Sequence, residues 1–331
     1  MDSLTLSFYD ASILSMGALF LGIVMLIKGG NWAIDAAVYV AERYDISPMV
    51  VGFTIIAFGT SLPELVVSVF ANIQGLPGIA LGNVVGSNIA NILLVLGVAS
   101  LFITLSARIS KELIRDLVFM LFATLVLAGL LCYGEITRMA GIIMLITLAV
   151  YVFVQFKTSS EEDFAPQDPE EAEVFKNDYM AYFTLFVGLV CIAVGSEFLV
   201  KGARVSAGLV GVPEAVIALS IVAFGTSLPE LSTSIIAARR KQAGMVIGNI
   251  IGSNVFNILM ILGLSAVVKP IEQGSFSSQL VSFDVWVALA VALICTLVLL
   301  WKGKISRVTG GMFFLGYIGY NVVIYMMNLA I

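Results

Sequence analysis

A stretch of nine residues occurs twice in this chain, each time within an apolar segment. Residues 57–65 read AFGTSLPEL, and the same letters return at residues 223–231. The match continues at the same offset of 166 residues, because the GSN at 86–88 returns at 252–254. Each copy places a carboxylate and several small polar side chains among hydrocarbon. Ionisable groups in such surroundings are costly and mark functional sites, so we predict a duplicated chain with one functional segment in each half.

The composition indicates a membrane protein. Of the 331 residues, 60% are hydrophobic and 12% are charged, whereas a soluble domain carries about 25% charged residues. The chain contains no histidine. That absence excludes serine–histidine catalysis, HExxH zinc sites and histidine proton relays.

Ten apolar segments are long enough to cross a bilayer as helices, which takes about 17–25 residues each. They are 11–41, 46–71, 78–103, 116–133, 139–156, 179–200, 212–238, 244–267, 283–301 and 310–329. Helix is the expected structure, because an open sheet cannot satisfy its backbone hydrogen bonds in lipid.

The motifs and the spans together predict the topology. Five spans separate each motif from its copy, and because five is odd the copies cross the membrane in opposite directions. The predicted fold is an all-α polytopic membrane protein with ten transmembrane helices, arranged as two inverted-topology five-helix repeats. The first repeat covers 1–156 with its motif at 57–97, and the second covers 179–331 with its motif at 223–263.

Residues 157–178 connect the repeats and are rich in Asp and Glu, with two prolines. This composition predicts a solvated, flexible linker. A calcium-sensing role is an alternative, but the segment has no loop of EF-hand spacing with a central glycine.

The distribution of Lys and Arg predicts the orientation. With the N-terminus outside, thirteen of these residues lie on the inner side and four on the outer side. The four outer residues are Arg138, Lys201, Arg204 and Lys269. Both termini are then extracytoplasmic, and the acidic linker is cytoplasmic.

The first half of the motif is expected to break its helix. Pro63 cannot donate a hydrogen bond to the carbonyl of Gly59, and its ring pushes against that turn. Carbonyls around Ala57 are then expected to be freed and to approach neighbouring hydroxyls and a carboxylate. The oxygen-bearing residues are Ala57, Thr60, Ser61 and Glu64 in one copy, and Ala223, Thr226, Ser227 and Glu230 in the other. An all-oxygen set suits hard cations such as Na⁺ and Ca²⁺.

The second half of the motif adds four polar residues, Ser87 and Asn91 in one copy and Ser253 and Asn257 in the other. Each Ser lies four residues before its Asn, so the two share one helical face. Taken alone, such residues also have purely structural explanations. Ser and Thr can hydrogen-bond to their own backbone, and Asn can join neighbouring helices. The two glutamates are harder to explain structurally, because an uncompensated acid at mid-helix costs about 2.5–3.5 kcal/mol.

GTSLPE and GSNxxN in two inverted copies resemble the alpha repeats of the calcium/cation antiporter superfamily, nearest its prokaryotic sodium/calcium exchangers. The resemblance implies a core of the second, third, seventh and eighth spans, against which the first and sixth slide. It implies that Glu64 and Glu230 are central ligands shared by Na⁺ and Ca²⁺, and that the other named residues complete four clustered sites. Some relatives carry Asp at the position of Asn257, and in potassium-dependent members an acid there is tied to K⁺. The neutral side chain here therefore argues against K⁺ dependence.

The expected protein is therefore not an enzyme. It is a secondary active antiporter that exchanges Ca²⁺ for Na⁺ by alternating access at one mid-membrane site, with those ions and the lipid bilayer as its partners. No cofactor, nucleic acid or obligatory protein partner is expected. The resemblance implies a prokaryotic cell (inner) membrane.

Three alternatives stay open. A proton-coupled Ca²⁺ antiporter uses the same scaffold, with the glutamates as proton carriers. A cation channel is disfavoured because an inverted Glu pair indicates one shared site rather than a ring from several subunits. An intramembrane hydrolase has neither a histidine nor a GxGD-type aspartate pair to support it.

Overall fold

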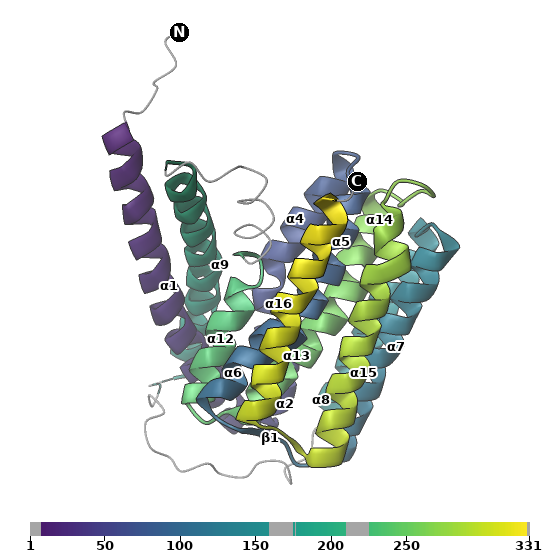
Figure 1. Ribbon diagram of the computed structural model, residues 1–331. Helices are drawn as coiled ribbons and strands as arrows, with labels where there is room; N and C mark the ends of the chain where they lie inside the picture. The colour runs from purple at the N-terminus through teal and green to yellow at the C-terminus, as the bar shows by residue number, and fades with distance from the viewer. Residues whose placement is uncertain (1–7, 159–174, 176, 210–224, 330–331) are drawn as a thin grey trace.

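The computed structural model describes residues 8–158, 175, 177–209 and 225–329, and these form a bundle of long helices (Figure 1). Eight described helices are long and apolar enough to cross a membrane, and a bent pair makes a ninth span. The chain is thus a helical, multi-span membrane protein. Residues 212–224 of the seventh predicted span, 212–238, and most of the predicted linker 157–178 lie outside the described residues.

The described first half contains five spans, of which the second is bent. Its elements are α1 (Phe8–Arg43), α2 (Pro48–Val51), the π-helical turn η1 (Gly52–Ile56), α3 (Ala57–Thr60), α4 (Leu62–Ile73), α5 (Pro77–Ala90), the π-helical turn η2 (Asn91–Leu96), α6 (Gly97–Phe102), β1 (Leu105–Ser106), α7 (Lys111–Tyr133) and α8 (Arg138–Thr158). The regular helices α5 and α6 run on through η2 as one span.

The second half repeats this order as far as it is described. Its elements are α9 (Asp178–Leu209), α12 (Leu228–Arg239), α13 (Ala243–Phe256), the π-helical turn η5 (Asn257–Leu262), α14 (Gly263–Val268), the π-helical turn η6 (Leu280–Asp284), α15 (Val285–Lys302), β2 (Lys304–Ile305) and α16 (Arg307–Leu329). The described start of α1 and the described end of α16 lie at the same end of the bundle (Figure 1).

Local sequence explains where the helices stop. Ser110 accepts a hydrogen bond from the Leu113 amide at 3.2 Å and so caps the start of α7. The same helix ends at Gly134, whose φ of 98° is a left-handed conformation that favours glycine. Gly303, with φ 60°, ends α15 in the same way.

The sixth predicted span ends too early. The sequence predicts 179–200, but α9 continues to Leu209. Lys201 and Arg204 therefore lie within a helix instead of an outer loop. The helix lets Lys201 form an ion pair with a carboxylate one turn earlier. Lys201 Nζ lies 2.9 Å from the carboxylate of Glu197, one turn earlier, and both side chains are exposed.

Helices α1 and α9 pack tightly side by side at one edge of the bundle (Figure 1). Small residues make this contact possible. A Cβ added to Gly22 would lie 2.7 Å from the carbonyl oxygen of Gly195, and one added to Gly29 would lie 2.8 Å from that of Gly188. The contacts recur every seven residues on both helices, as in antiparallel helices joined along one small-residue stripe.

The centre of the bundle is formed by α5, η2 and α6 from one half and α13, η5 and α14 from the other, which are almost entirely buried. Outer helices such as α1 and α16 expose most of their apolar side chains. This inverts the pattern of a soluble protein, because lipid is an apolar solvent for the outer surface.

Two short β contacts link the halves. Leu105 pairs with Ile305 across β1 and β2. Ile271, 166 residues after Leu105, forms a bridge with Ile136 through backbone hydrogen bonds of 2.9 and 3.0 Å. Since Ile136 follows α7, one span later than β1, the two contacts lie at opposite ends of the bundle.

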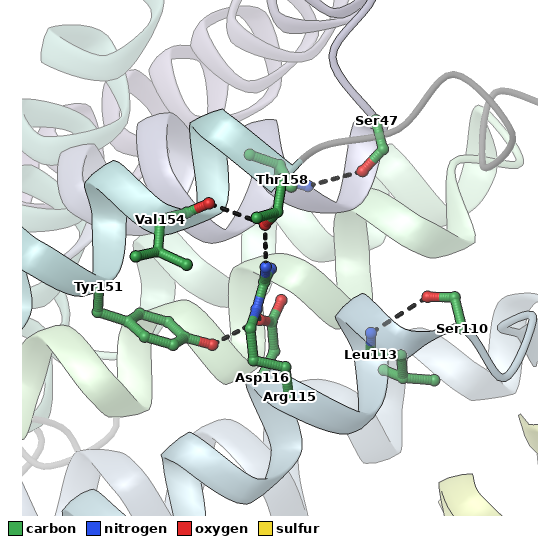
Figure 2. A network of polar contacts seen from close by, with 9 residues as sticks. Ser47, Ser110, Leu113, Arg115, Asp116, Tyr151, Val154 and Thr158 are labelled. Carbon is green, nitrogen blue, oxygen red and sulfur yellow. Dashed lines mark hydrogen bonds and ion pairs between the residues drawn. The ribbon is translucent and has the colours of Figure 1, made fainter.

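A buried carboxylate, Asp116, joins α7 to α8 (Figure 2). Asp116 is fully buried and accepts hydrogen bonds from the Tyr151 hydroxyl at 2.5 Å and from Arg115 Nε at 2.9 Å. Arg115 also contacts Thr158 and lies 5.8 Å from the Tyr151 ring centre. Phe119 stacks on the same ring, with 3.5 Å between centroids.

The second half carries a related pair. Asp284 at the end of η6 accepts hydrogen bonds from the Tyr320 hydroxyl at 3.1 Å and from Gln279 Nε2 at 3.3 Å. These bonds tie the η6–α15 segment to α16. Both donors are neutral, whereas Asp116 also accepts from an arginine. The two halves thus join their last two helices with similar but unequal clamps.

The small-residue contact between α1 and α9 predicts a position-specific effect. Gly22→Leu should destabilise the protein by about 1–3 kcal/mol, because a side chain there overlaps the backbone of α9. Gly17→Leu is the matched control, since nothing lies within 4 Å of a Cβ at Gly17. Thermal unfolding of the detergent-solubilised proteins measures the difference, and equal midpoints for the two variants would contradict the close packing.

The unequal clamps predict unequal costs of removing one hydroxyl. Tyr151→Phe should cost about 1.5–3 kcal/mol, the range for a hydrogen bond to a charged group, because the Asp116 carboxylate then stays buried with one donor fewer. Tyr320→Phe should cost less, because its bond to Asp284 is longer. The same unfolding measurement tests this order, and a Tyr320→Phe loss as large as that of Tyr151→Phe would show that the clamps are equivalent.

Candidate functional site

A helix begins directly after the serine of the repeated motif in both copies. Ser61 separates α3 from α4 with φ −82° and ψ 1°, and Ser227 precedes α12 with φ −87° and ψ 4°. Pro63 and Pro229 follow as the second residues of α4 and α12, where a missing amide hydrogen costs least. The span formed by residues 48–60 and 62–73 bends by 46° at the break. The predicted proline-induced break is therefore present.

The carbonyl of Ala57 differs from expectation. Its oxygen accepts from the Ser61 amide at 3.0 Å and from the Thr60 hydroxyl at 3.4 Å, so it is not freed by the break. The reason is that α3 completes a full turn before the chain bends at Ser61. Ala223, the corresponding residue of the second copy, lies outside the described residues.

The two glutamates meet inside the protein. Glu64 and Glu230 stand in the first turns of α4 and α12, and each is 1% exposed. The packing of α4 against η5 and of α12 against η2 brings both glutamates to the buried centre of the bundle. The first turn of a helix favours negative charge, because its unpaired amides carry a partial positive charge. Neither side chain faces lipid.

The first half contributes groups near the glutamate of the second half. Thr60 and Ser61 lie near the Glu230 carboxylate, although Ser61 Oγ and both Glu230 carboxylate oxygens form no hydrogen bond of normal geometry. The elements cross in the same way, since η5 packs against α4 and η2 packs against α12. The site is thus assembled from both repeats.

Most of the candidate residues carry buried oxygens without a hydrogen-bond donor. These oxygens are Ser61 Oγ, Glu64 Oε2, Asn91 Oδ1, Ser227 Oγ, both carboxylate oxygens of Glu230, Ser253 Oγ and Asn257 Oδ1. Leaving one such acceptor unsatisfied costs about 1–3 kcal/mol, and more for a charged one. A cluster of unpartnered hydroxyl, amide and carboxylate oxygens that includes two carboxylates is the ligand set that a hard cation needs.

The remaining candidates are also located. Ser87 is 4% exposed in α5, one helical turn before Asn91. Thr226 is partly buried next to Gly225, whose carbonyl accepts a hydrogen bond of 2.9 Å from Ser196 in α9. The second copy of the motif is therefore in direct contact with the outer helix pair.

Two features were not expected from the sequence. Asn91 and Asn257 each begin a π-helical turn, η2 and η5, where the motif predicts regular helix. Such turns are rare and frequently occur at functional sites. Asn88 and Asn254 were also missed as site residues, although both stand within the repeated GSN.

Asn88 and Asn254 each form a side-chain hydrogen bond with an asparagine of the other repeat. Asn91 Nδ2 donates to Asn254 Oδ1 at 3.1 Å, and Asn257 Nδ2 donates to Asn88 Oδ1 at 3.1 Å. The two bonds are equivalent under the 166-residue offset. All four side chains are at most 4% exposed.

A helical membrane bundle with a buried, oxygen-rich carboxylate pair belongs to the class of proteins that handle hard cations within the membrane. Comparison with known proteins narrows this class. A family model described as sodium/calcium exchanger protein matches residues 14–157 and 180–326. The chain therefore belongs to the sodium/calcium exchanger family. The relatives that it matches are transporters and not enzymes.

Individual relatives agree with this assignment. The sodium/calcium exchanger MaX1 of Methanosarcina acetivorans is 32% identical over 93% of this chain and 97% of its own. The putative antiporter CaxA of Alkalimonas amylolytica is 34% identical over 92% and 96%. A structure of the sodium-calcium exchanger NCX_Mj, soaked with Na⁺ and Sr²⁺, matches with a TM-score of 0.79 and 31% identity, covering 92% of this chain and 97% of that one.

Proposed function

We propose that this protein is a secondary active antiporter that exchanges Ca²⁺ for Na⁺ by alternating access at one shared site. The observation that carries the proposal is the buried pair of glutamates surrounded by oxygens that lack hydrogen-bond donors. The names of MaX1 and NCX_Mj, both sodium/calcium exchangers, support Na⁺ and Ca²⁺ as the transported ions.

We propose ten transmembrane helices in two inverted five-helix repeats. The elements α4, α5, η2 and α6 have the same bounds as α12, α13, η5 and α14 after a shift of 166 residues. The reciprocal asparagine bonds are what a two-fold axis between the halves produces. The β contacts at opposite ends of the bundle support an axis in the membrane plane.

The repeat limits follow from the same observations. The family model matches twice, at 14–157 and 180–326, which supports repeats at 1–156 and 179–331. The segment 157–178 is then a linker, and the Lys and Arg distribution supports its cytoplasmic location with both termini outside. We propose an inner-membrane location on the resemblance to prokaryotic exchangers.

The proposed ligands are the motif residues of both repeats. Glu64 and Glu230 bind at the centre, and hydroxyl, amide and carbonyl oxygens complete the coordination. The other ligands are Ala57, Thr60, Ser61, Ser87, Asn91, Ala223, Thr226, Ser227, Ser253 and Asn257. The Thr60 hydroxyl, at 3.4 Å, is the more distant of the two donors to the Ala57 carbonyl, and rotation of that hydroxyl would free one lone pair for an ion.

The charge of the site explains obligatory exchange. Two ionised carboxylates give the site a charge of −2, which one Ca²⁺ or several Na⁺ ions neutralise. An unneutralised pair resists enclosure at low dielectric, because the carboxylates repel each other and lose hydration. The rearrangement between outward and inward access is then easy only with cations bound. Ion gradients set the direction of transport.

Removing either central carboxylate should abolish transport. Glu64→Gln and Glu230→Gln each remove one of the two charges that compensate Ca²⁺, so Na⁺-driven Ca²⁺ uptake into proteoliposomes should fall to the level of empty liposomes. Glu197→Gln is the matched control, because that glutamate is 62% exposed on α9. Uptake at the unchanged rate in either site variant would remove the central role of the glutamate pair.

The coupling ion is tested by exchanging gradients. Ca²⁺ uptake should follow an imposed Na⁺ gradient and should not respond to K⁺, because Asn91 and Asn257 are neutral. A pH gradient without Na⁺ should drive no uptake. Uptake under that last condition would identify a proton-coupled antiporter on the same scaffold and overturn Na⁺ coupling.

A further inference from the structure

Asn91 and Asn257 pose a chemical problem for cation binding. A carboxylate offers oxygen at both ends, but an amide offers one oxygen and one NH₂ group. If the amide rotates by half a turn, it presents two hydrogen-bond donors to the cation instead of a lone pair. An amide ligand therefore needs a partner that fixes which end faces the ion.

Asn254 and Asn88 are placed to be those partners. Asn254 Oδ1 accepts from Asn91 Nδ2, and Asn88 Oδ1 accepts from Asn257 Nδ2, both at 3.1 Å. The opposite ends, Asn91 Oδ1 and Asn257 Oδ1, are buried without a hydrogen-bond donor. The donor end of each amide is thus engaged while its acceptor end is available.

The partners are themselves held in one orientation. Asn88 Nδ2 donates to the backbone carbonyl of Asn254 at 3.2 Å, which turns Asn88 Oδ1 towards Asn257. Asn254 Nδ2 contacts Met120 Sδ of α7 at 3.7 Å, which turns Asn254 Oδ1 towards Asn91. Burial strengthens this arrangement. A buried amide that loses its hydrogen-bond partner cannot bond to water instead, so the loss carries a large free-energy cost.

We propose that Asn88 and Asn254 are positioning residues that orient the amide oxygens of Asn257 and Asn91 towards the transported cation. This inference rests on the proposed function, because it assumes that those two amides are ligands. Neither positioning residue needs to touch the ion. Each acts across the repeat interface on the ligand of the other half, which makes one half's binding geometry depend on the other.

The proposal predicts that Asn88 is no longer needed for Ca²⁺ binding when the residue it orients, at position 257, is not an amide. Asn88→Ala should weaken Ca²⁺ binding by at least about tenfold, equivalent to about 1.4 kcal/mol. In the Asn257→Asp background, the same Asn88→Ala change should alter Ca²⁺ binding less than about twofold, or tighten it, because a carboxylate presents oxygen in either orientation. Each ratio is taken within its own background, so the added charge of Asn257→Asp cancels.

The repeat supplies matched controls. Asn254→Ala should be rescued by Asn91→Asp and not by Asn257→Asp. Asn88→Ala should likewise not be rescued by Asn91→Asp, because Asn91 is oriented by Asn254. A general loss of packing at either position would not respect this pairing.

The experiment measures equilibrium Ca²⁺ binding to the detergent-solubilised full chain, together with the apparent KM and Vmax of Na⁺-driven Ca²⁺ uptake. We expect Asn88→Ala to raise KM more than it lowers Vmax. Equal losses in both Asn257 backgrounds, or rescue by the wrong aspartate, would overturn the positioning role. If Asn257→Ala itself leaves binding unchanged, the ligand assignment fails instead, so the two failures are distinguishable; thermal unfolding excludes a misfolded variant.

Discussion

The structure depends on the enclosure of two carboxyl groups in an apolar bundle. Glu64 and Glu230 are each 1% exposed, and neither has a cationic side chain as a described partner. In a medium of low dielectric two ionised carboxylates are tolerated only with counter-charge or hydration. The bent helices, the helix N-termini at both glutamates and the surrounding oxygens all serve this one requirement. In the proposed function, a transported cation supplies the counter-charge.

Close helix approach is the second requirement, because oxygens from both repeats must reach one point. Glycine at 248 and 252 lets α13 lie against the backbone of Met49 and Phe53. An added Cβ at either position would overlap the main chain of α2 or η1, in the second span. The small residues of the motif therefore act indirectly on the site, by allowing the spans that carry ligands to converge.

Much of this was predictable from the sequence. The break at Pro63, the burial of both glutamates and most span limits follow from the duplicated motif and the lengths of apolar segments. The π-helical turns at Asn91 and Asn257 were not predictable, because they arise from packing between spans and not from local propensity. The Asp116–Tyr151 pair was missed for a related reason: its members lie in different spans, and only their contact reveals the clamp.

The differences between the halves carry information that the repeat does not. Asp35 of α1 forms an ion pair of 3.1 Å with Arg240, which follows α12. The positions related by the repeat offset are Lys201 and Gln74, which cannot form such a pair. In the proposed alternating-access mechanism, a perfectly symmetric protein would have two access states of equal energy. An ion pair found in only one half of the described chain would make those two states unequal, so in this proposal the motif defines the site and the unrepeated residues set the balance between its two openings.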